Sequence, residues 1–190
     1  MTDNKLNADR GKTTVYSWIG PPRITVSTKS VVHNGKQWMQ HVVEGDEGGV
    51  GVVAVATHNG RHLLVEHFRP ATNETLTEFP RGFGMAPSPG STPEQQACID
   101  AKRELLEETG IVANSAAFLG YIWPDSGILG NKVAVVGIEA KSEHPSSGTD
   151  GEIDGCQWAT HQNVRMGIRT GRISDGITLA AYSLWCASAI

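Results

Sequence analysis

One helix can be placed in this sequence with both of its ends defined, between residues 92 and 110. Thr92 fits the N-cap, Pro93 suits the first helical position, and Gln95 completes a T-x-x-Q capping box with Thr92. Gly110 supplies the C-terminal stop. Because β-branched, strand-like segments lie on both sides of this helix, the chain must fold as a sheet with helices packed on it.

The segments around the helix alternate apolar and polar residues, which is typical of strands. Asn34-Gly35 divides a first pair of such runs and Asn59-Gly60 divides a second pair, and both dipeptides are hairpin signals. After the helix, the patterns predict strands at residues 115–123, 131–141 and 156–160 and helices at residues 161–171 and 174–188. This order of elements predicts one layered α/β or α+β domain.

Composition narrows the class of protein. The chain has 190 residues, of which 39% are hydrophobic, and a formal net charge of −4, as expected for one globular domain. No apolar run approaches the roughly 18 residues that a membrane helix needs, and residues 1–14 lack the apolar core of a secretory signal. Without Lys/Arg clusters, binding to nucleic-acid polymers is disfavoured. We therefore expect a cytoplasmic protein that binds a small molecule and no membrane.

Residues 103–111, RELLEETGI, concentrate acidic side chains on one side of the predicted helix. Glu104 and Glu108 lie about 40° apart on the helix surface, and Arg103 forms an i,i+4 pair with Glu107. Stacked like charges destabilise a helix by roughly 0.2 to 0.5 kcal/mol per pair, so they usually face something positive. A hard divalent cation, Mg²⁺ or Mn²⁺, is the natural candidate. The alternative is an ordinary solvated face of a surface helix.

The same stretch resembles the second half of the Nudix signature, R-E-U-x-E-E-x-G-U with U apolar, at every defined position. The first half, G-x5-E-x7, differs, because Gln95 stands in the place of the early glutamate and Pro89 in that of the glycine. If Gly82 is the motif glycine, a seven-residue insertion follows it. We prefer this alignment because EFPRGF is similar to Nudix proteins that cleave ADP-ribose. Glu94, Asp100 or no residue replaces the early glutamate.

The resemblance covers about residues 20–187 and implies an α/β fold, the Nudix-type α/β/α sandwich with a mixed β-sheet and an N-terminal β-hairpin extension. On this basis we predict a disordered leader at residues 1–15, an N-terminal β-segment at 16–45 and a Nudix hydrolase domain at 46–190. In related proteins the N-terminal segment often reaches across a dimer. A homodimer is therefore expected by resemblance alone.

The resemblance also implies an activity. It is the Mg²⁺-dependent hydrolysis of a nucleoside diphosphate linked to a moiety X, with ADP-ribose or a nucleotide sugar as the leading substrates. The products are a nucleoside monophosphate and a phosphorylated product. An alternative of a different class is a Nudix-like sensor domain that binds a nucleotide without turnover. The altered first half of the signature favours this alternative, and the intact second half favours the hydrolase.

The resemblance assigns the metal ligands as follows. Glu104 and Glu108 would hold the divalent ions, which bind the diphosphate oxygens and activate a water molecule. Arg103 would brace Glu107 as a further ligand. The backbone carbonyl of Arg81 is another ligand by analogy.

Further residues are candidates for the remaining roles. Glu152, in the loop TDGEIDG, matches a mobile-loop glutamate of ADP-ribose pyrophosphatases and is a candidate general base, although acidic loops are usually only solvated. Arg69, Arg81 and the backbone at Gly82 are candidates for substrate binding, since guanidinium groups bind phosphate or carboxylate bidentately. Trp123 is a candidate for stacking on a base, whereas aromatic residues at strand ends more often simply pack.

Overall fold

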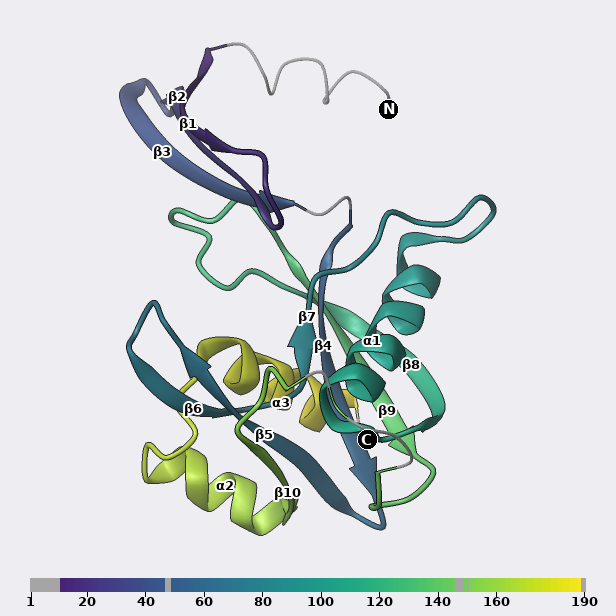
Figure 1. Ribbon diagram of the computed structural model, residues 1–190. Helices are drawn as coiled ribbons and strands as arrows, with labels where there is room; N and C mark the ends of the chain where they lie inside the picture. Colours follow the sequence, from purple (N-terminus) through teal and green to yellow (C-terminus); the bar gives the residue numbers. More distant parts are fainter. Residues whose placement is uncertain (1–10, 47–48, 146–148, 150, 189–190) are drawn as a thin grey trace. The chain divides into compact units, whose positions relative to one another are not determined.

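The structure is a computed structural model that describes residues 11–46, 49–145, 149 and 151–188. The chain divides into two compact units, which are described separately. The smaller unit consists of residues 1–47 and 125–131, and the larger unit consists of residues 48–124 and 132–190. Figure 1 labels the helices and strands of both.

The smaller unit is an antiparallel sheet of three strands in the described residues, β1 (Lys12–Trp18), β2 (Arg23–His33) and β3 (Lys36–Asp46). Asn34 and Gly35 join β2 to β3 with positive φ angles of 49° and 73°, as a two-residue hairpin turn requires, so the predicted hairpin is confirmed. The predicted disordered leader is wrong from Lys12 onward, because β1 pairs with β2. Residues 1–10 of that leader lie outside the described residues.

The loop of residues 125–131 belongs to the smaller unit, although the predicted 46–190 domain had included it. Its backbone pairs with β3: Val43 N donates to Ile128 O at 2.8 Å, and Gly130 N donates to Val43 O at 2.9 Å. The side chain of Asn131 also accepts a hydrogen bond from Gly45 N at 2.7 Å. These contacts join residues far apart in the sequence, so no local pattern predicted them.

The larger unit contains a mixed sheet. Its strands, within the described residues, are β4 (Gly51–His58), β5 (Arg61–Arg69), β6 (Glu74–Glu78), β7 (Arg81–Gly82), β8 (Ala113–Ile122), β9 (Val133–Ala140) and β10 (Gly155–Thr160). The main order is β10-β5-β4-β9-β8, with β6 paired to β5 and β7 paired to β4. β4 and β9 are parallel, and the other pairs are antiparallel.

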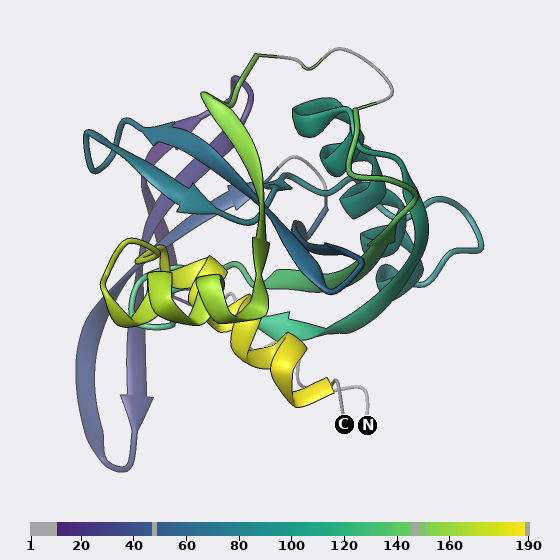
Figure 2. The same ribbon diagram turned by 90° about the horizontal axis from the view of Figure 1, so that it is seen from below.

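Helices cover both faces of this sheet, as Figures 1 and 2 show. α1 (Pro93–Thr109) packs on one face, and α2 (His161–Arg169) and α3 (Gly176–Ser188) pack on the other. The alternation of β4 side chains explains this: Val52 lies in the core with α1, whereas Val53 lies in the core with α2 and α3. The predicted α/β/α sandwich is confirmed. Among the described residues, no helix combines the length and the apolar character needed to cross a membrane.

α1 begins and ends at the predicted residues. The Thr92 side chain accepts a hydrogen bond from Gln95 N at 3.2 Å, and the Gln95 side chain accepts one from Thr92 N at 2.9 Å. Gly110 adopts a left-handed conformation with φ 68°, and its N–H donates to Leu106 O at 2.8 Å. These caps set the length of the helix, so the face bearing Glu104 is defined by local interactions.

Candidate active site

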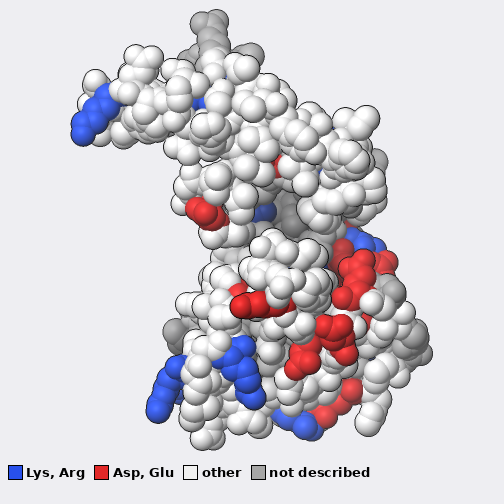
Figure 3. Space-filling view, turned by 60° about the vertical axis from the view of Figure 1, so that its left-hand side comes forward, with Lys and Arg blue, Asp and Glu red and all other residues white. Residues whose placement is uncertain are grey.

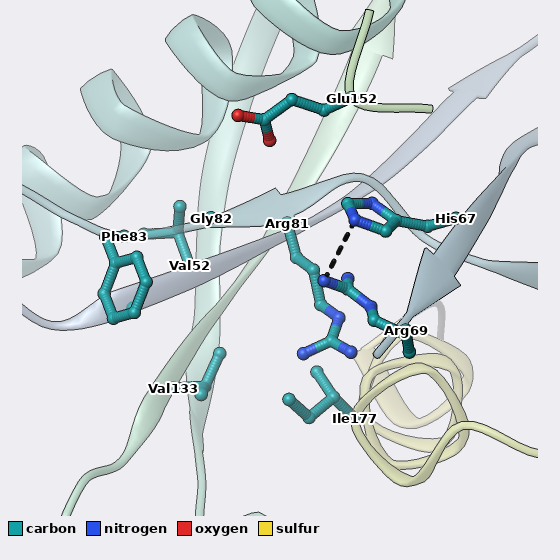
Figure 4. A pocket seen from close by; sticks show the side chains of 10 residues that line it. Val52, His67, Arg69, Arg81, Gly82, Phe83, Val133, Glu152 and Ile177 are labelled. Atoms are coloured by element: carbon teal, nitrogen blue, oxygen red, sulfur yellow. Dashed lines mark hydrogen bonds between the residues drawn. The ribbon is translucent and has the colours of Figure 1, made fainter. Parts of the chain in front are cut away.

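A cavity of about 330 Å³ lies in the larger unit, beside the short strand β7. Four of the predicted site residues line it: Arg69, Arg81, Gly82 and Glu152. The other lining residues are Gly51, Val52, His67, Phe83, Val133 and Ile177. Figure 4 shows that the side chains come from β4, β5, β7, β9, α3 and the loop before β10. The cavity therefore has a polar part built from charged side chains and an apolar part.

The polar part is built around a buried carboxylate. Glu78, at the end of β6, is fully buried and accepts hydrogen bonds from Arg69 Nη2 at 2.6 Å and from Arg81 Nε at 2.8 Å. Burial alone would raise the pKa of Glu78, but the two arginines outweigh it and hold the pKa below the ordinary value. Arg81 Nη2 also lies 3.3 Å from Asp175 Oδ1. The two arginines therefore keep Glu78 in its ionised form, and Asp175 extends the ion-pair network through Arg81.

His67 extends this cluster as a neutral group. Burial and the charge of Arg69 lower the pKa of His67 below its ordinary value. Arg69 Nη1 lies 3.3 Å from His67 Nε2, and since a guanidinium can only donate, Nε2 accepts and the ring proton belongs on Nδ1. Figure 4 shows this contact at the edge of the cavity. Sequence reasoning missed Glu78 and Asp175, because their partners lie on other elements. It also missed His67, although its partner Arg69 lies two residues further along the same strand.

Glu104, from α1, packs directly against Gly82. A Cβ atom on Gly82 would lie only 2.3 Å from Glu104 Cδ, so this close approach requires glycine. Arg103 Nη2 donates to Glu104 Oε1 at 2.7 Å and to Phe83 O at 2.9 Å, and Arg103 Nη1 donates to Glu107 Oε2 at 2.7 Å. Arg103 thus holds two carboxylates against the segment that follows β7. This contact supports the alignment in which Gly82 is the motif glycine.

The carboxylates near Gly82 repel one another. Burial raises the pKa of Glu104 above its ordinary value; Arg103 opposes this, and the charges of Glu107 and Glu152 raise it further. Glu108 is 2% exposed, and its charge raises the pKa of Arg69. The structure therefore brings Glu104 into electrostatic contact with Glu152, and Glu108 into electrostatic contact with Arg69.

The chemistry of these donors fits a hard divalent cation. Carboxylate oxygens are the ligands that Mg²⁺ and Mn²⁺ prefer, and a cation beside Glu104 would relieve the repulsion that raises its pKa. Figure 3 shows that acidic side chains also gather over one region of the larger unit's surface. Within the described residues, no group of three or more His, Cys, Asp or Glu side chains is arranged to hold a metal ion. The ligand assignments to Glu104, Glu107, Glu108 and the Arg81 carbonyl thus stay predictions.

The residues considered as replacements for the early glutamate have other partners. Gln95 forms the capping box of α1. Glu94 Oε1 lies 3.4 Å from Tyr121 Oη, which donates to it. Asp100 is buried, and its carboxylate accepts a hydrogen bond from Met85 N at 2.9 Å. Each of these side chains therefore has a contact that supports the fold around the first half of α1.

Trp123, which was predicted to stack on a base, does not line this cavity. Trp123 is 57% exposed and is not among the lining residues, whereas Phe83, 41% exposed, is one of them. Phe83 follows Gly82 directly, and its carbonyl is fixed by Arg103. An aromatic residue directly after a motif glycine was the available sequence signal for Phe83. Stacking of a base on Trp123 stays a prediction.

The comparisons with known proteins agree with this geometry. The NUDIX domain family matches residues 46–178, so the chain belongs to that family. The crystal structure of an ADP compounds hydrolase is similar, with a TM-score of 0.65 over 93% of each chain at 15% sequence identity. At this identity the similarity establishes a shared fold. No curated protein matches the sequence.

Proposed function

We propose that this protein is a divalent-metal-dependent hydrolase that cleaves the diphosphate of a nucleoside diphosphate linked to a moiety X, most favourably ADP-ribose or a nucleotide sugar. Its membership of the NUDIX family and its fold similarity to an ADP compounds hydrolase support this class of reaction. One observation carries the proposal: Glu104, whose side chain is only 13% exposed, packs on Gly82 beside a cavity lined by two arginines. The products are a nucleoside monophosphate and phosphorylated X.

The helix carboxylates hold the cation in this proposal. Glu104 and Glu108 are the principal ligands, and Glu107 and the backbone carbonyl of Arg81 are additional candidates. A bound divalent ion, Mg²⁺ or Mn²⁺, supplies charge neutralisation at the diphosphate and lowers the pKa of water. Arg103 keeps Glu104 and Glu107 in fixed orientations through its two hydrogen bonds at 2.7 Å.

Other residues bind the substrate and move a proton. Arg69 and Arg81 donate hydrogen bonds to substrate oxygens, and Phe83 offers an apolar face to a base or sugar ring. Glu152, whose carboxylate points into the cavity in Figure 4, is the proposed general base that accepts a proton from the attacking water. The charge of Glu152 raises the pKa of Glu104, which requires the two carboxylates to lie near each other. This proximity supports the assignment.

A turnover assay tests the proposal. Phosphate release, coupled to a phosphatase, is measured on ADP-ribose, nucleotide sugars and dinucleotides with Mg²⁺ and with Mn²⁺. We expect metal-dependent cleavage of at least one compound and its loss in Glu104→Gln with substrate binding retained. Absence of turnover on every compound, with nucleotide binding still seen as a thermal shift, would contradict the hydrolase.

Nucleotide binding without turnover would support the alternative function, a nucleotide-binding sensor. The specific observation in its favour is that Gln95 stands in the place of the early glutamate and is engaged in the helix cap. Glu94 and Asp100 are likewise engaged elsewhere. The homodimer, the cytoplasmic location and the choice between Mg²⁺ and Mn²⁺ remain predictions for either function.

A further inference from the structure

The arginine cluster of the cavity carries no net formal charge. The positive charges of Arg69 and Arg81 are matched by the negative charges of Glu78 and Asp175, each within ion-pair distance. His67 adds no charge near neutral pH, since burial lowers its pKa. Glu152, which also lines the cavity, adds a further negative charge. The side chains here therefore provide directional donors without a surplus of positive charge.

The two guanidinium groups still have hydrogen atoms to offer. Each guanidinium has five N–H groups. Arg69 uses Nε and Nη2 toward Glu78 and Nη1 toward His67, and Arg81 uses Nε toward Glu78 and Nη2 toward Asp175. Because both arginines line the cavity, the remaining N–H groups are positioned for a ligand. Hydroxyl and carbonyl oxygens match such donors, whereas a phosphate group needs positive charge as well.

We propose that Asp175 and Glu78 determine substrate specificity by neutralising Arg69 and Arg81, so that this end of the cavity accepts a hydroxylated, uncharged group and rejects one that carries an additional phosphate. The inference rests on the proposed function, because it concerns the part of the substrate beyond the diphosphate. An additional phosphate at this end of the cavity would meet the negative charge of Glu152 and no surplus of positive charge from the arginines, and such repulsion is an effective source of specificity.

Asp175 is the residue at which this can be tested cleanly. Its Oδ2 accepts a hydrogen bond from Thr178 N at 2.8 Å and so caps the N-terminus of α3, while its Oδ1 faces Arg81 Nη2. Asparagine is an equally good N-cap, so Asp175→Asn keeps the cap and removes the charge. Asp175 acts on the substrate through Arg81, which makes it a positioning residue.

The experiment compares ADP-ribose with two derivatives that carry one more phosphate, on the terminal ribose or on the adenosine. Dissociation constants are measured by calorimetry in the presence of Ca²⁺, and kcat/KM is measured with Mg²⁺. We expect the wild type to discriminate against at least one derivative, and Asp175→Asn to reduce that discrimination about tenfold, mainly through Kd and KM. Glu78→Gln, the second variant, should shift the ratio in the same direction.

The matched control is Glu143→Gln. It also removes a carboxylate that is paired with an arginine, Arg61 at 2.6 Å, but neither residue lines the cavity. The ratio between substrates should not change in this control. Equal affinity of the wild type for all three compounds, or an unchanged ratio in both Asp175→Asn and Glu78→Gln, would overturn the inference. A shifted binding ratio without turnover by any variant would support the inference and contradict only the hydrolase.

Discussion

The two halves of α1 carry the same kind of acidic side chain and use it differently. In the first half, the buried carboxylate of Asp100 accepts a hydrogen bond from Met85 N at 2.9 Å. In the second half, Glu104 is partly buried near other carboxylates, and burial together with their charges raises its pKa. A carboxylate held by a backbone N–H serves the fold, whereas one kept near like charges would be stabilised by a cation. In the proposed function, position along one helix therefore separates structural acids from functional ones.

The most direct test of this comparison is to neutralise one acidic side chain in each half of α1. Glu104→Gln should reduce kcat on the order of 10²- to 10³-fold, as expected when one group that stabilises transition-state charge is lost. Glu94→Gln should change kcat less than about twofold, because the removed charge lies at the cap of α1. Steady-state turnover on the best substrate of the panel measures both. Similar losses in the two variants would show that the halves are not functionally distinct.

Gly82→Ala tests the contact that places Glu104. The new Cβ would lie 2.3 Å from Glu104 Cδ, so the carboxylate must move. We expect turnover to fall roughly 10- to 100-fold, since misplacement of a catalytic group by about 1 Å has effects of this size. Thermal stability should change little, because the displaced atoms are the end of a flexible side chain.

Gly155→Ala is the matched control for this substitution. A Cβ on Gly155 would meet no heavy atom within 4 Å, so turnover should be retained. Full activity of Gly82→Ala would mean that Glu104 does not need its observed position, and it would remove the strongest geometric support for the second half of α1 as the metal-binding half.

The same comparison shows which features the sequence could predict. The bounds of α1 were predicted correctly because Thr92, Gln95 and Gly110 act within a few residues of one another. The stripe of Glu104 and Glu108 follows from the helix period alone. The role of Glu78 could not be predicted in this way. A lone glutamate in a short strand has no local signal that two arginines will enclose it. Only the pairing of β6 with β5, in which Glu78 lies opposite Val65, brings the Arg69 side chain within hydrogen-bond distance of it.

Nonlocal packing explains the other omissions as well. Asp100 was considered as a substitute ligand because it continues the acidic stripe of α1, yet the loop at Met85 folds back onto it. Residues 12–15 of β1 were assigned to a disordered leader, because the hydrogen bonds that hold them come from β2 and leave no signal in their own sequence. Periodicity reports which face a residue occupies, and it does not report what covers that face.

Stability in the absence of metal provides a third test. Neutralising an acid in the first half of α1 should lower the free energy of unfolding, and neutralising one in the second half should not. With a chelator at pH 7, Asp100→Asn should lower the free energy of unfolding by about 1 to 3 kcal/mol, because a buried charged hydrogen-bond partner is lost. Glu104→Gln should leave the free energy of unfolding unchanged or raise it, because it removes a partly buried carboxylate from a group of like charges. Urea unfolding measures both variants.

The free energy of unfolding is expected to change with pH in a defined direction. Because folding raises the pKa of Glu104, its ionisation disfavours the folded state, and stability falls as the pH rises through the folded-state pKa. Relative to Glu104→Gln, the metal-free wild type should therefore lose stability between acidic and neutral pH. If the difference in the free energy of unfolding between the wild type and Glu104→Gln stayed constant from pH 4 to pH 8, folding would not raise the pKa of Glu104.

The smallest effect is expected at position 95, where glutamine stands in the place of the early glutamate of the Nudix signature. Gln95→Glu restores the early glutamate, but the side chain at position 95 is exposed and binds Thr92 N at 2.9 Å. At 1.5 Å of rise per residue, position 95 lies about 13 Å along the helix from Glu104, too far for a shared cation. Turnover should change less than about twofold, and stability should rise by roughly 0.3 to 1 kcal/mol through the helix dipole.

Parallel measurements of kcat and of urea unfolding on Gln95→Glu decide this point. Because glutamate serves in a capping box as well as glutamine does, the fold is not expected to change. A rise in turnover of tenfold or more would mean that the first half of α1 does contribute a ligand and that its loss had impaired the enzyme. An unchanged turnover together with the gain in stability would leave the metal chemistry to Glu104, Glu108 and the residues that approach them from outside the helix.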